Sequence, residues 1–175
     1  MCGITGYWQK EKIHDEKQLL EMSQPIFNRG PDDYGFYIDK NCGLGLAHRR
    51  LSILDLSKFG HQPMTSFSGR YQIIYNGEIY NHREIRENLK SNNINWLGNS
   101  DTETLVNCIE IIGFKKTLEM LRGMFSIALW DKKTEELWLA RDRFGEKPLF
   151  YGIQNNVFLF GSQISSIRKH KAFNN

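Results

Sequence analysis

Short runs of β-branched, aromatic and other apolar residues recur along the chain and are separated by Gly, Asn and Asp. Runs of this length, bounded by turn-forming residues, are typical of β-strands. The predicted strands cover Ile4–Trp8, Gly35–Ile38, Leu44–His48, Arg70–Tyr75, Met124–Trp130, Glu136–Ala140, Pro148–Gly152 and Val157–Phe160. This amount of strand excludes a helical bundle.

Two pairs of these strands are close enough in sequence to form hairpins. Met124–Trp130 is joined to Glu136–Ala140 by the polar segment Asp131–Glu135, and the last two predicted strands are joined by a turn at Asn155-Asn156. Connections this short require antiparallel pairing. The C-terminal part of the chain is therefore predicted to be built from antiparallel hairpins.

Two segments between the strands carry helix start signals. Asp15 precedes Glu16–Met22 and belongs to the residue types that cap helix N-termini. Asn81, with Glu84 three residues later, predicts a second helix that ends at Leu89.

A third helix is predicted after Ser100, which forms a capping box with Glu103. Leu105, Ile109 and Ile112 recur at helical spacing, so one face of this helix is expected to pack on a sheet. Sheets and helices then occupy separate layers, and α+β is the predicted fold class.

The composition indicates one globular domain over residues 1–175. A hydrophobic share of 40% supplies a sizeable core, and the formal charge of +3 does not favour a nucleic-acid partner. The first residues, MCGITGYWQKEK, lack the features of a signal peptide, and no run approaches the ~20 apolar residues of a membrane span. We expect a cytoplasmic protein with neither a nucleic-acid nor a membrane partner.

The three cysteines Cys2, Cys42 and Cys108 lack the close pairing of a zinc site or a redox motif. We expect reduced thiols and no metal site. Cys42 and Cys108 are interpreted as packing residues.

Cys2 becomes the N-terminal residue if an aminopeptidase removes Met1, since a small residue follows that methionine. Its α-amine, with a pKa of ~8, then acts as a base for its own thiol. One residue supplies nucleophile and base together. The alternative is a small buried cysteine near the start of a strand, and the position alone does not exclude it.

The segment Tyr75-Asn76-Gly77-Glu78 follows a predicted strand and offers donors for an oxyanion. The Asn76 amide and the Gly77 backbone N–H suit the tetrahedral intermediate of thiolate attack on an amide. Asn-Gly is also a common hairpin turn, but the residues after it show no alternating second strand.

An amide substrate that is also a free amino acid carries an α-carboxylate and an α-ammonium, so a site for it needs a cation and an anion. Arg50 and Asp101 are the candidates. Arg49 serves equally well on composition alone, and Asp101 is also explained as a first-turn acid favoured by the helix dipole.

With these residues in view, the chain strongly resembles class II (N-terminal nucleophile) glutamine amidotransferase domains, most closely the N-terminal domain of glutamine-hydrolysing asparagine synthetases. The resemblance covers nearly the whole chain in the family's order. It rests on MCGITGYW, NRGPDD, AHRRLSILDLS, GHQPM, IIYNGEIYNH, SDTE, GMFSIALWD and ARDRFGEKPLFY.

The resemblance implies a four-layer αββα sandwich of two antiparallel sheets, of the N-terminal nucleophile hydrolase type. It implies that Cys2 is the nucleophile, that Asn76 and Gly77 form the oxyanion hole, and that Arg50, rather than Arg49, binds the glutamine carboxylate. The other residues it implies are backbone contacts from Leu51, Ser52, Ile53 and Leu54, and a site for the α-ammonium made by Glu78 and Asp101.

The resemblance also implies the partners. Glutamine is the substrate, and a synthetase domain or chain receives the ammonia for asparagine synthesis or, in related enzymes, for amidation of another carboxylate. The ATP-binding loop of the synthetase domain is absent from this sequence, so no ATP, Mg²⁺ or other cofactor is expected for this domain. The family usually has Gly-Ser-Glu-Ile-Lys where this chain has Gly161-Ser162-Gln163-Ile164-Ser165, a departure at the seam between domains.

Two alternatives remain. The first is an N-terminal nucleophile amidase for another amide, which has no need for the paired Arg50 and Asp101. The second is a non-catalytic docking module, because a retained Met1 blocks the amine that the chemistry requires.

Overall fold

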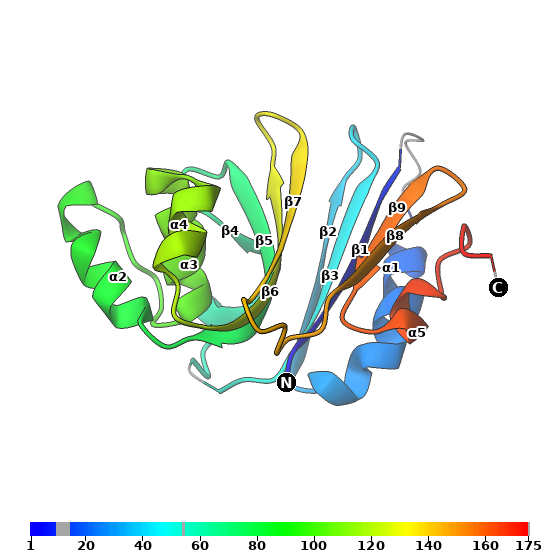
Figure 1. Cartoon of the computed structure of the whole chain (residues 1–175), viewed down its shortest axis with the longest axis horizontal. Coiled ribbons are helices and arrows are strands. Elements are labelled where there is room, and N and C mark those ends of the chain that lie inside the picture. Colours follow the sequence, from blue (N-terminus) through cyan, green and yellow to red (C-terminus); the bar gives the residue numbers. More distant parts are fainter. Residues whose placement is uncertain (10–14, 54, 175) are drawn as a thin grey trace.

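The computed structural model describes residues 1–9, 15–53 and 55–174. Two antiparallel sheets pack face to face, and helices cover the outer face of each sheet (Figure 1). This arrangement is α+β, as the sequence predicts.

Within the described residues, the first sheet has the strand order β2-β3-β1-β9-β8 and the second has the order β4-β5-β6-β7. Every neighbouring pair is antiparallel. The strands are β1 Gly3–Gln9, β2 Asp33–Asp39, β3 Leu44–Arg50, β4 Met64–Thr65, β5 Tyr71–Ile79, β6 Gly123–Asp131, β7 Glu136–Arg141, β8 Phe150–Gln154 and β9 Val157–Gly161. All the predicted strands form, although β8 starts later than predicted and β4 was not predicted.

The helices form the two outer layers. Helices α2 (His82–Asn88), α3 (Asp101–Ile112) and α4 (Phe114–Met120) lie on the side of β5 and β6, while α1 (Glu16–Ser23) and α5 (Ile164–Ile167) lie on the other side (Figure 1). Three 3₁₀ turns complete the described elements: η1 Gln24–Arg29, η2 Lys58–Gly60 and η3 Lys90–Asn92.

Each interface between layers has its own apolar core. The side chains between the two sheets are Ile4, Leu44, Leu46, Ile74, Ala128, Trp130 and Phe160. Leu105 and Ile109 of α3 pack on the outer face of the second sheet, and Ile112 packs at the edge of the same cluster, as predicted. Leu19 and Met22 of α1 do the same on the first sheet. The four-layer sandwich implied by the resemblance is confirmed.

The helix caps follow the local signals only in part. Asp15 accepts from the Gln18 N–H at 3.0 Å, as predicted. The helix predicted after Asn81 forms, with Asn81 at its N-cap, but the Asn81 side chain does not cap it: Nδ2 donates to the Met120 carbonyl and Oδ1 accepts from the Arg122 N–H. A tertiary partner therefore outcompetes the helix end.

The capping box of α3 is also half formed. Ser100 accepts from the Glu103 N–H at 3.2 Å. The Glu103 carboxylate accepts from the N–H groups of Leu97 and Gly98 and from Arg86, so it holds the preceding loop.

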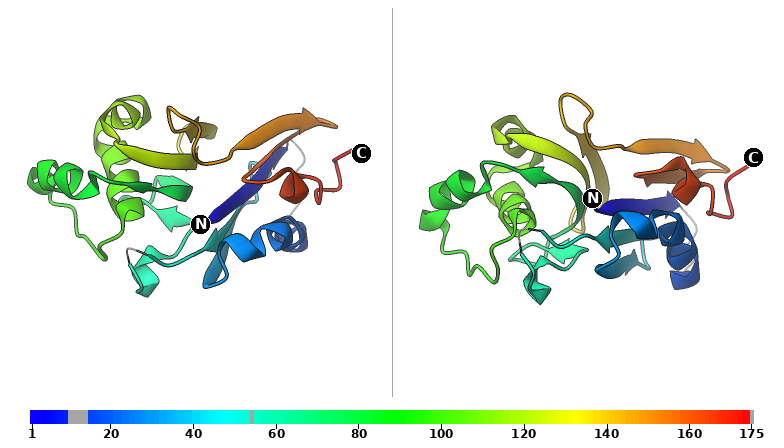
Figure 2. Two further views of the ribbon diagram at one scale, coloured as in Figure 1. Left: turned by 60° about the horizontal axis from the view of Figure 1, so that its bottom comes forward. Right: turned by 90° about the horizontal axis from the view of Figure 1, so that it is seen from below.

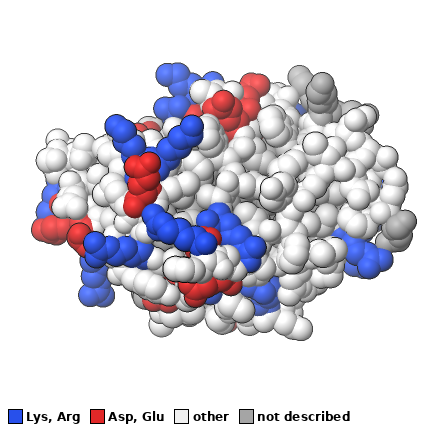
Figure 3. All heavy atoms as spheres, viewed as in Figure 1, with Lys and Arg blue, Asp and Glu red and all other residues white. Residues whose placement is uncertain are grey.

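The face shown in Figure 3 carries Lys and Arg side chains among Asp and Glu side chains, and the area toward β8 and β9 is mostly uncharged. No helix in the described ranges combines the length and the apolar character needed to cross a membrane.

The elements converge where the chain begins. Gly3 at the start of β1 pairs with Arg49 at the end of β3, so Cys2 lies beside the residues that follow β3. Figure 2 places the N-terminus between the two sheets. The end of β5, from the second sheet, and the first turn of α3 lie at the same place.

Candidate active site

A cavity of about 130 Å³ lies where the N-terminus meets the ends of β3 and β5 and the start of α3. It brings together most of the predicted site residues: Cys2, Arg50, Leu51, Ile53, Asn76, Gly77, Glu78 and Asp101. Ser52 lines the neighbouring hollow instead, and its N–H donates to Asp32. Leu54 lies outside the described residues.

The Cys2 thiol is fixed by the backbone that follows β3. Its Sγ lies 3.4 Å from the Leu51 nitrogen, which donates to it, and 3.6 Å from the Leu51 oxygen, which accepts from it. The Cys2 carbonyl accepts from Arg29 Nε at 3.0 Å. The thiol therefore has a defined position before any substrate is bound.

Burial raises the pKa of the Cys2 thiol above its ordinary value, and the Asp101 carboxylate raises it further. The Leu51 N–H, the N-terminal ammonium and Arg50 act in the opposite direction but do not cancel the effect of burial. The thiol is thus protonated at rest, and its use as a nucleophile requires a base.

Asn76 brings a buried donor to the cavity. Strand β5 continues through Asn76, Gly77 and Glu78, which pair with Ser126, Phe125 and Met124 of β6, so the Asn-Gly hairpin turn is excluded. Asn76 is 1% exposed, and its Nδ2 has no hydrogen-bond partner among the described residues. An unpaired buried amide is costly, which is typical of a donor kept for a ligand.

Gly77 allows a close approach of backbone to backbone. A Cβ at this position would lie 2.3 Å from the Met124 oxygen and 2.8 Å from the Phe125 Cα. Only glycine fits here without moving β6.

Arg50 is 8% exposed, and its guanidinium donates to the carbonyls of Asp55 and of Ser57, the latter at 3.1 Å. Gly60 leaves the space that the guanidinium occupies, because a Cβ there would lie 1.9 Å from Nη2. Arg50 takes part in none of the ion pairs found within the described residues. It is a buried cation held by neutral acceptors.

Arg49 faces the opposite side of β3. It donates to Ser23, and its guanidinium lies 4.8 Å from the centre of the Tyr34 ring and 5.4 Å from that of Phe27. The structure therefore brings Arg50, not Arg49, into the cavity.

Asp101 is presented by the first turn of α3. Its Oδ2 accepts from the Tyr75 hydroxyl at 2.7 Å and from the Ile79 N–H at 2.9 Å. Burial and the carboxylate hold the pKa of Tyr75 well above its ordinary value, so the hydroxyl stays a donor. These bonds fix the carboxylate between β5 and α3.

Sequence reasoning missed several residues of the lining. Gln62 accepts from the Tyr75 N–H at 2.7 Å and donates to Thr102, and it belongs to the GHQPM string to which no role was given. Lys147 is 6% exposed and lies 3.5 Å from the Met1 sulfur. Met1 itself also lines the cavity.

The described residues contain no group of three or more His, Cys, Asp and Glu side chains placed to hold a metal. All three cysteines are free thiols. His48 Nε2 donates to the Tyr75 carbonyl at 3.1 Å across the two sheets, and the complete burial of His48 lowers its pKa to about 3. It is a neutral residue that joins the two sheets.

Residues 1–175 match the family model of the glutamine amidotransferase domain. The chain belongs to this family. The glutamine amidotransferase domain is 37% identical over 174 residues to the glutamine-hydrolysing asparagine synthetase 3 of Bacillus subtilis, covering 97% of this chain and 28% of the relative. It is 39% identical over 171 residues to asparagine synthetase 1 of the same organism, covering 95% of this chain and 26% of the relative.

A solved structure shares the fold. Glutamine phosphoribosylpyrophosphate amidotransferase from Bacillus subtilis superposes with a TM-score of 0.80 at 19% identity, over 98% of this chain and 44% of the other. The domain is thus of the asparagine synthetase type in sequence, and it spans about a quarter of the length of those curated relatives.

Proposed function

We propose that this domain hydrolyses L-glutamine to glutamate and ammonia, with Cys2 as the nucleophile after removal of Met1. The supporting observation is that a single cavity contains a thiol, an unpaired buried donor, a buried cation and a buried carboxylate, contributed by Cys2, Asn76, Arg50 and Asp101. This set matches the amide, the carboxylate and the ammonium of one glutamine molecule.

The α-amine of mature Cys2 takes the thiol proton as the sulfur attacks the Cδ amide carbon. The raised pKa of the thiol makes this base necessary at neutral pH. The intermediate collapses when the C–N bond breaks, and the amine passes the proton to the leaving ammonia. A γ-glutamyl thioester remains on Sγ.

Water then attacks the thioester carbonyl, with the α-amine as base. The C–S bond breaks, glutamate leaves, and the thiol recovers its proton. In the formation and in the hydrolysis of the thioester, the oxyanion accepts from Asn76 Nδ2 and from the Gly77 N–H. In other enzymes, removal of one oxyanion donor lowers kcat by about 10²–10³-fold. These steps require no metal or organic cofactor.

Arg50 binds the α-carboxylate in this proposal, because it is a buried guanidinium whose partners are two backbone carbonyls. Asp101 and Glu78 receive the α-ammonium. Both internal bonds of Asp101 fall on Oδ2, which leaves Oδ1 for the substrate.

We further propose that the ammonia serves an amidation of the asparagine synthetase type, carried out by a synthetase domain or chain that uses ATP and Mg²⁺. The similarity to glutamine-hydrolysing asparagine synthetases supports this acceptor. The alternative acceptor is another carboxylate, in a related enzyme.

The test is the release of ammonia and glutamate from glutamine by protein whose intact mass shows the loss of Met1. We expect both products in equal amounts from the wild type and none above background from Cys2→Ala. Cys42→Ala is the matched control, because Cys42 is also partly buried but lies outside the cavity lining. Correctly processed wild type without turnover contradicts the proposal and favours a docking module.

A further inference from the structure

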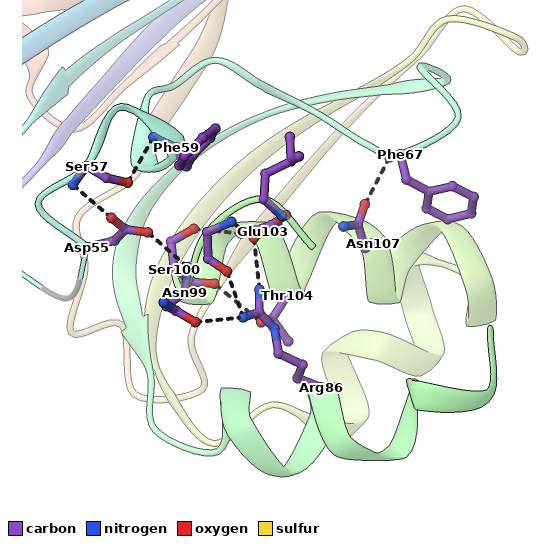
Figure 4. A network of polar contacts seen from close by, with 12 residues as sticks. Asp55, Ser57, Phe59, Phe67, Arg86, Asn99, Ser100, Glu103, Thr104 and Asn107 are labelled. Carbon is purple, nitrogen blue, oxygen red and sulfur yellow. Dashed lines mark hydrogen bonds and ion pairs between the residues drawn. The ribbon is translucent and has the colours of Figure 1, made fainter. Parts of the chain in front are cut away.

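Two loops far apart in sequence meet beside the cavity, and one carboxylate joins them. Asp55 lies in the loop after β3, and its Oδ1 accepts from the Ser57 N–H at 2.8 Å. Its Oδ2 accepts from the Asn99 N–H, 44 residues further along, at 2.9 Å. Figure 4 shows the Asp55 carboxylate between these two partners.

Each loop adjoins one of the charged groups of the site: Arg50 ends β3 and Asp101 begins α3. The carbonyls of Asp55 and Ser57 accept from the Arg50 guanidinium. Asn99 directly precedes Ser100, the N-cap of the helix that presents Asp101. The Asp55 side chain therefore connects the segment that holds the cation with the helix start that holds the anion.

The loop that carries Asn99 is also held on the side away from Asp55. Glu103 accepts from the N–H groups of Leu97 at 2.7 Å and of Gly98 at 3.0 Å. It also forms an ion pair with Arg86 at 2.9 Å, and both of these residues are drawn in Figure 4. Arg86 in turn lies over the Trp96 ring at 4.0 Å from its centre. This loop is anchored to α2 and α3, so its position cannot adjust freely to the first loop.

The two loops also fit tightly at their contact. A Cβ at Gly98 would lie 2.7 Å from Asp55 Oδ2 and 2.8 Å from the Phe59 Cβ. Hydrogen bonds from Ser57 hold the pKa of Asp55 below its ordinary value, so the carboxylate is charged at neutral pH. Asp55 is part of the cavity lining, and each of its carboxylate oxygens already accepts from a backbone N–H group within the protein.

We propose that Asp55 is a positioning residue that sets the separation between Arg50 and Asp101, and that it thereby selects amides that carry both an α-carboxylate and an α-ammonium. The inference rests on the proposed glutamine hydrolysis and adds a determinant of its specificity. A fixed separation matters only to a substrate that uses both groups at once, because such a substrate cannot relax toward one of them.

The test compares Asp55→Asn with the wild type on three amides. These are glutamine, glutaramate, which lacks the ammonium, and 4-aminobutyramide, which lacks the carboxylate. We expect the KM for glutamine to rise by about tenfold, the factor that corresponds to one lost charge-assisted hydrogen bond. The kcat for glutamine is expected to change by less than about twofold, because the lost bond is equally present in the ground state and the transition state. The KM values of the two analogues are also expected to change by less than about twofold, because each analogue uses only one of the two charged groups.

Two controls separate a positioning role of Asp55 from a general disturbance of the fold or of the nucleophile. Asp39→Asn is the matched variant, because the Asp39 carboxylate also holds a turn through two backbone N–H groups, at the opposite end of β2 and β3. It is expected to leave the preference for glutamine unchanged. The rate of Cys2 alkylation by iodoacetamide is expected to be equal in the wild type and in Asp55→Asn, because the nucleophile end is untouched.

Calorimetric titration of the three amides into the Cys2→Ala form, with and without Asp55→Asn, measures the same preference without turnover. A folded Asp55→Asn protein that keeps the wild-type preference in both measurements overturns the inference. If Asp55→Asn does not fold, Gly98→Ala separates the same loops without altering the carboxylate and is judged by the same ratio. A third outcome is that the wild type shows no turnover, while the Cys2→Ala form prefers glutamine and loses that preference on Asp55→Asn. This outcome contradicts the proposed hydrolysis and leaves the role of Asp55 standing.

Discussion

Gly60 offers a way to displace Arg50 without changing any side chain that contacts substrate. A Cβ at this position would lie 1.9 Å from Arg50 Nη2 and 2.6 Å from Cζ. Because non-bonded heavy atoms settle at roughly 3.5 Å or more, the guanidinium in Gly60→Ala must move by roughly 1.5 Å. A hydrogen bond lengthened by that amount is no longer a hydrogen bond.

The expected cost follows from the lost contact with the α-carboxylate. One charge-assisted hydrogen bond contributes about 1.5–3 kcal/mol, so the KM for glutamine is expected to rise by about 10- to 150-fold. The kcat is expected to change little, because this contact is equally present in ground state and transition state. Stability is expected to fall by only about 1 kcal/mol, a shift in Tm of about 2–4 °C, since the clashing atoms are the end of a flexible side chain.

The assay is steady-state ammonia release together with a thermal melt. Gly152→Ala is the matched control, because no heavy atom lies within 4 Å of a Cβ at that position. It is expected to leave KM unchanged. An unaltered KM in folded Gly60→Ala refutes the role assigned to Arg50, and a loss of kcat alone refutes the division between binding and chemistry.

Three further predictions follow from the same geometry. Asn76→Ala is expected to lower kcat by about 10²–10³-fold with little change in KM, and a change in KM alone would contradict its role as an oxyanion donor. Tyr75→Phe removes the hydroxyl bonded to Asp101 and is expected to raise KM by roughly threefold to tenfold, measured in the same assay. His48 has a folded pKa of about 3, below its unfolded value, so its contribution to stability is complete above pH 6.5 and is lost as the pH falls toward 3. Denaturant titrations measure how much the free energy of unfolding falls between pH 7 and pH 5. This fall is expected to be smaller by about 2 kcal/mol in His48→Gln than in the wild type, and equal falls would refute the assignment.

The strands and most of the helix starts were predictable because their signals are local. Asp15 and Ser100 cap the helices that follow them, as their residue types indicate. Asn81 has the same type of signal, but Met120 and Arg122 lie close enough in the fold to take its side chain. The local sequence pattern does not reveal a hydrogen-bond partner that only the tertiary structure brings near.

The choice between Arg49 and Arg50 shows a second limit. All residues of β3 are buried, so the alternation that separates two faces in a half-exposed strand is absent. The family motif identified Arg50, and the structure gives the reason: Arg49 packs between the rings of Phe27 and Tyr34 on the helix side.

Asp55 was beyond reach for a different reason. Its partner Asn99 is contributed by a loop that only the packing of α3 on the second sheet brings near. The residues that perform the proposed chemistry are visible as motifs, whereas the residue that spaces them depends on the tertiary structure alone.

The central claim is that Cys2 forms a covalent γ-glutamyl thioester, and rapid acid quench followed by intact-mass measurement tests it most directly. Protein that has lost Met1 is mixed with glutamine and quenched within the first turnover. The account predicts a mass increase of one γ-glutamyl group, located on Cys2 by fragmentation and absent from Cys2→Ala. Glutamine turnover by Cys2→Ala, or an adduct on another residue, would contradict it.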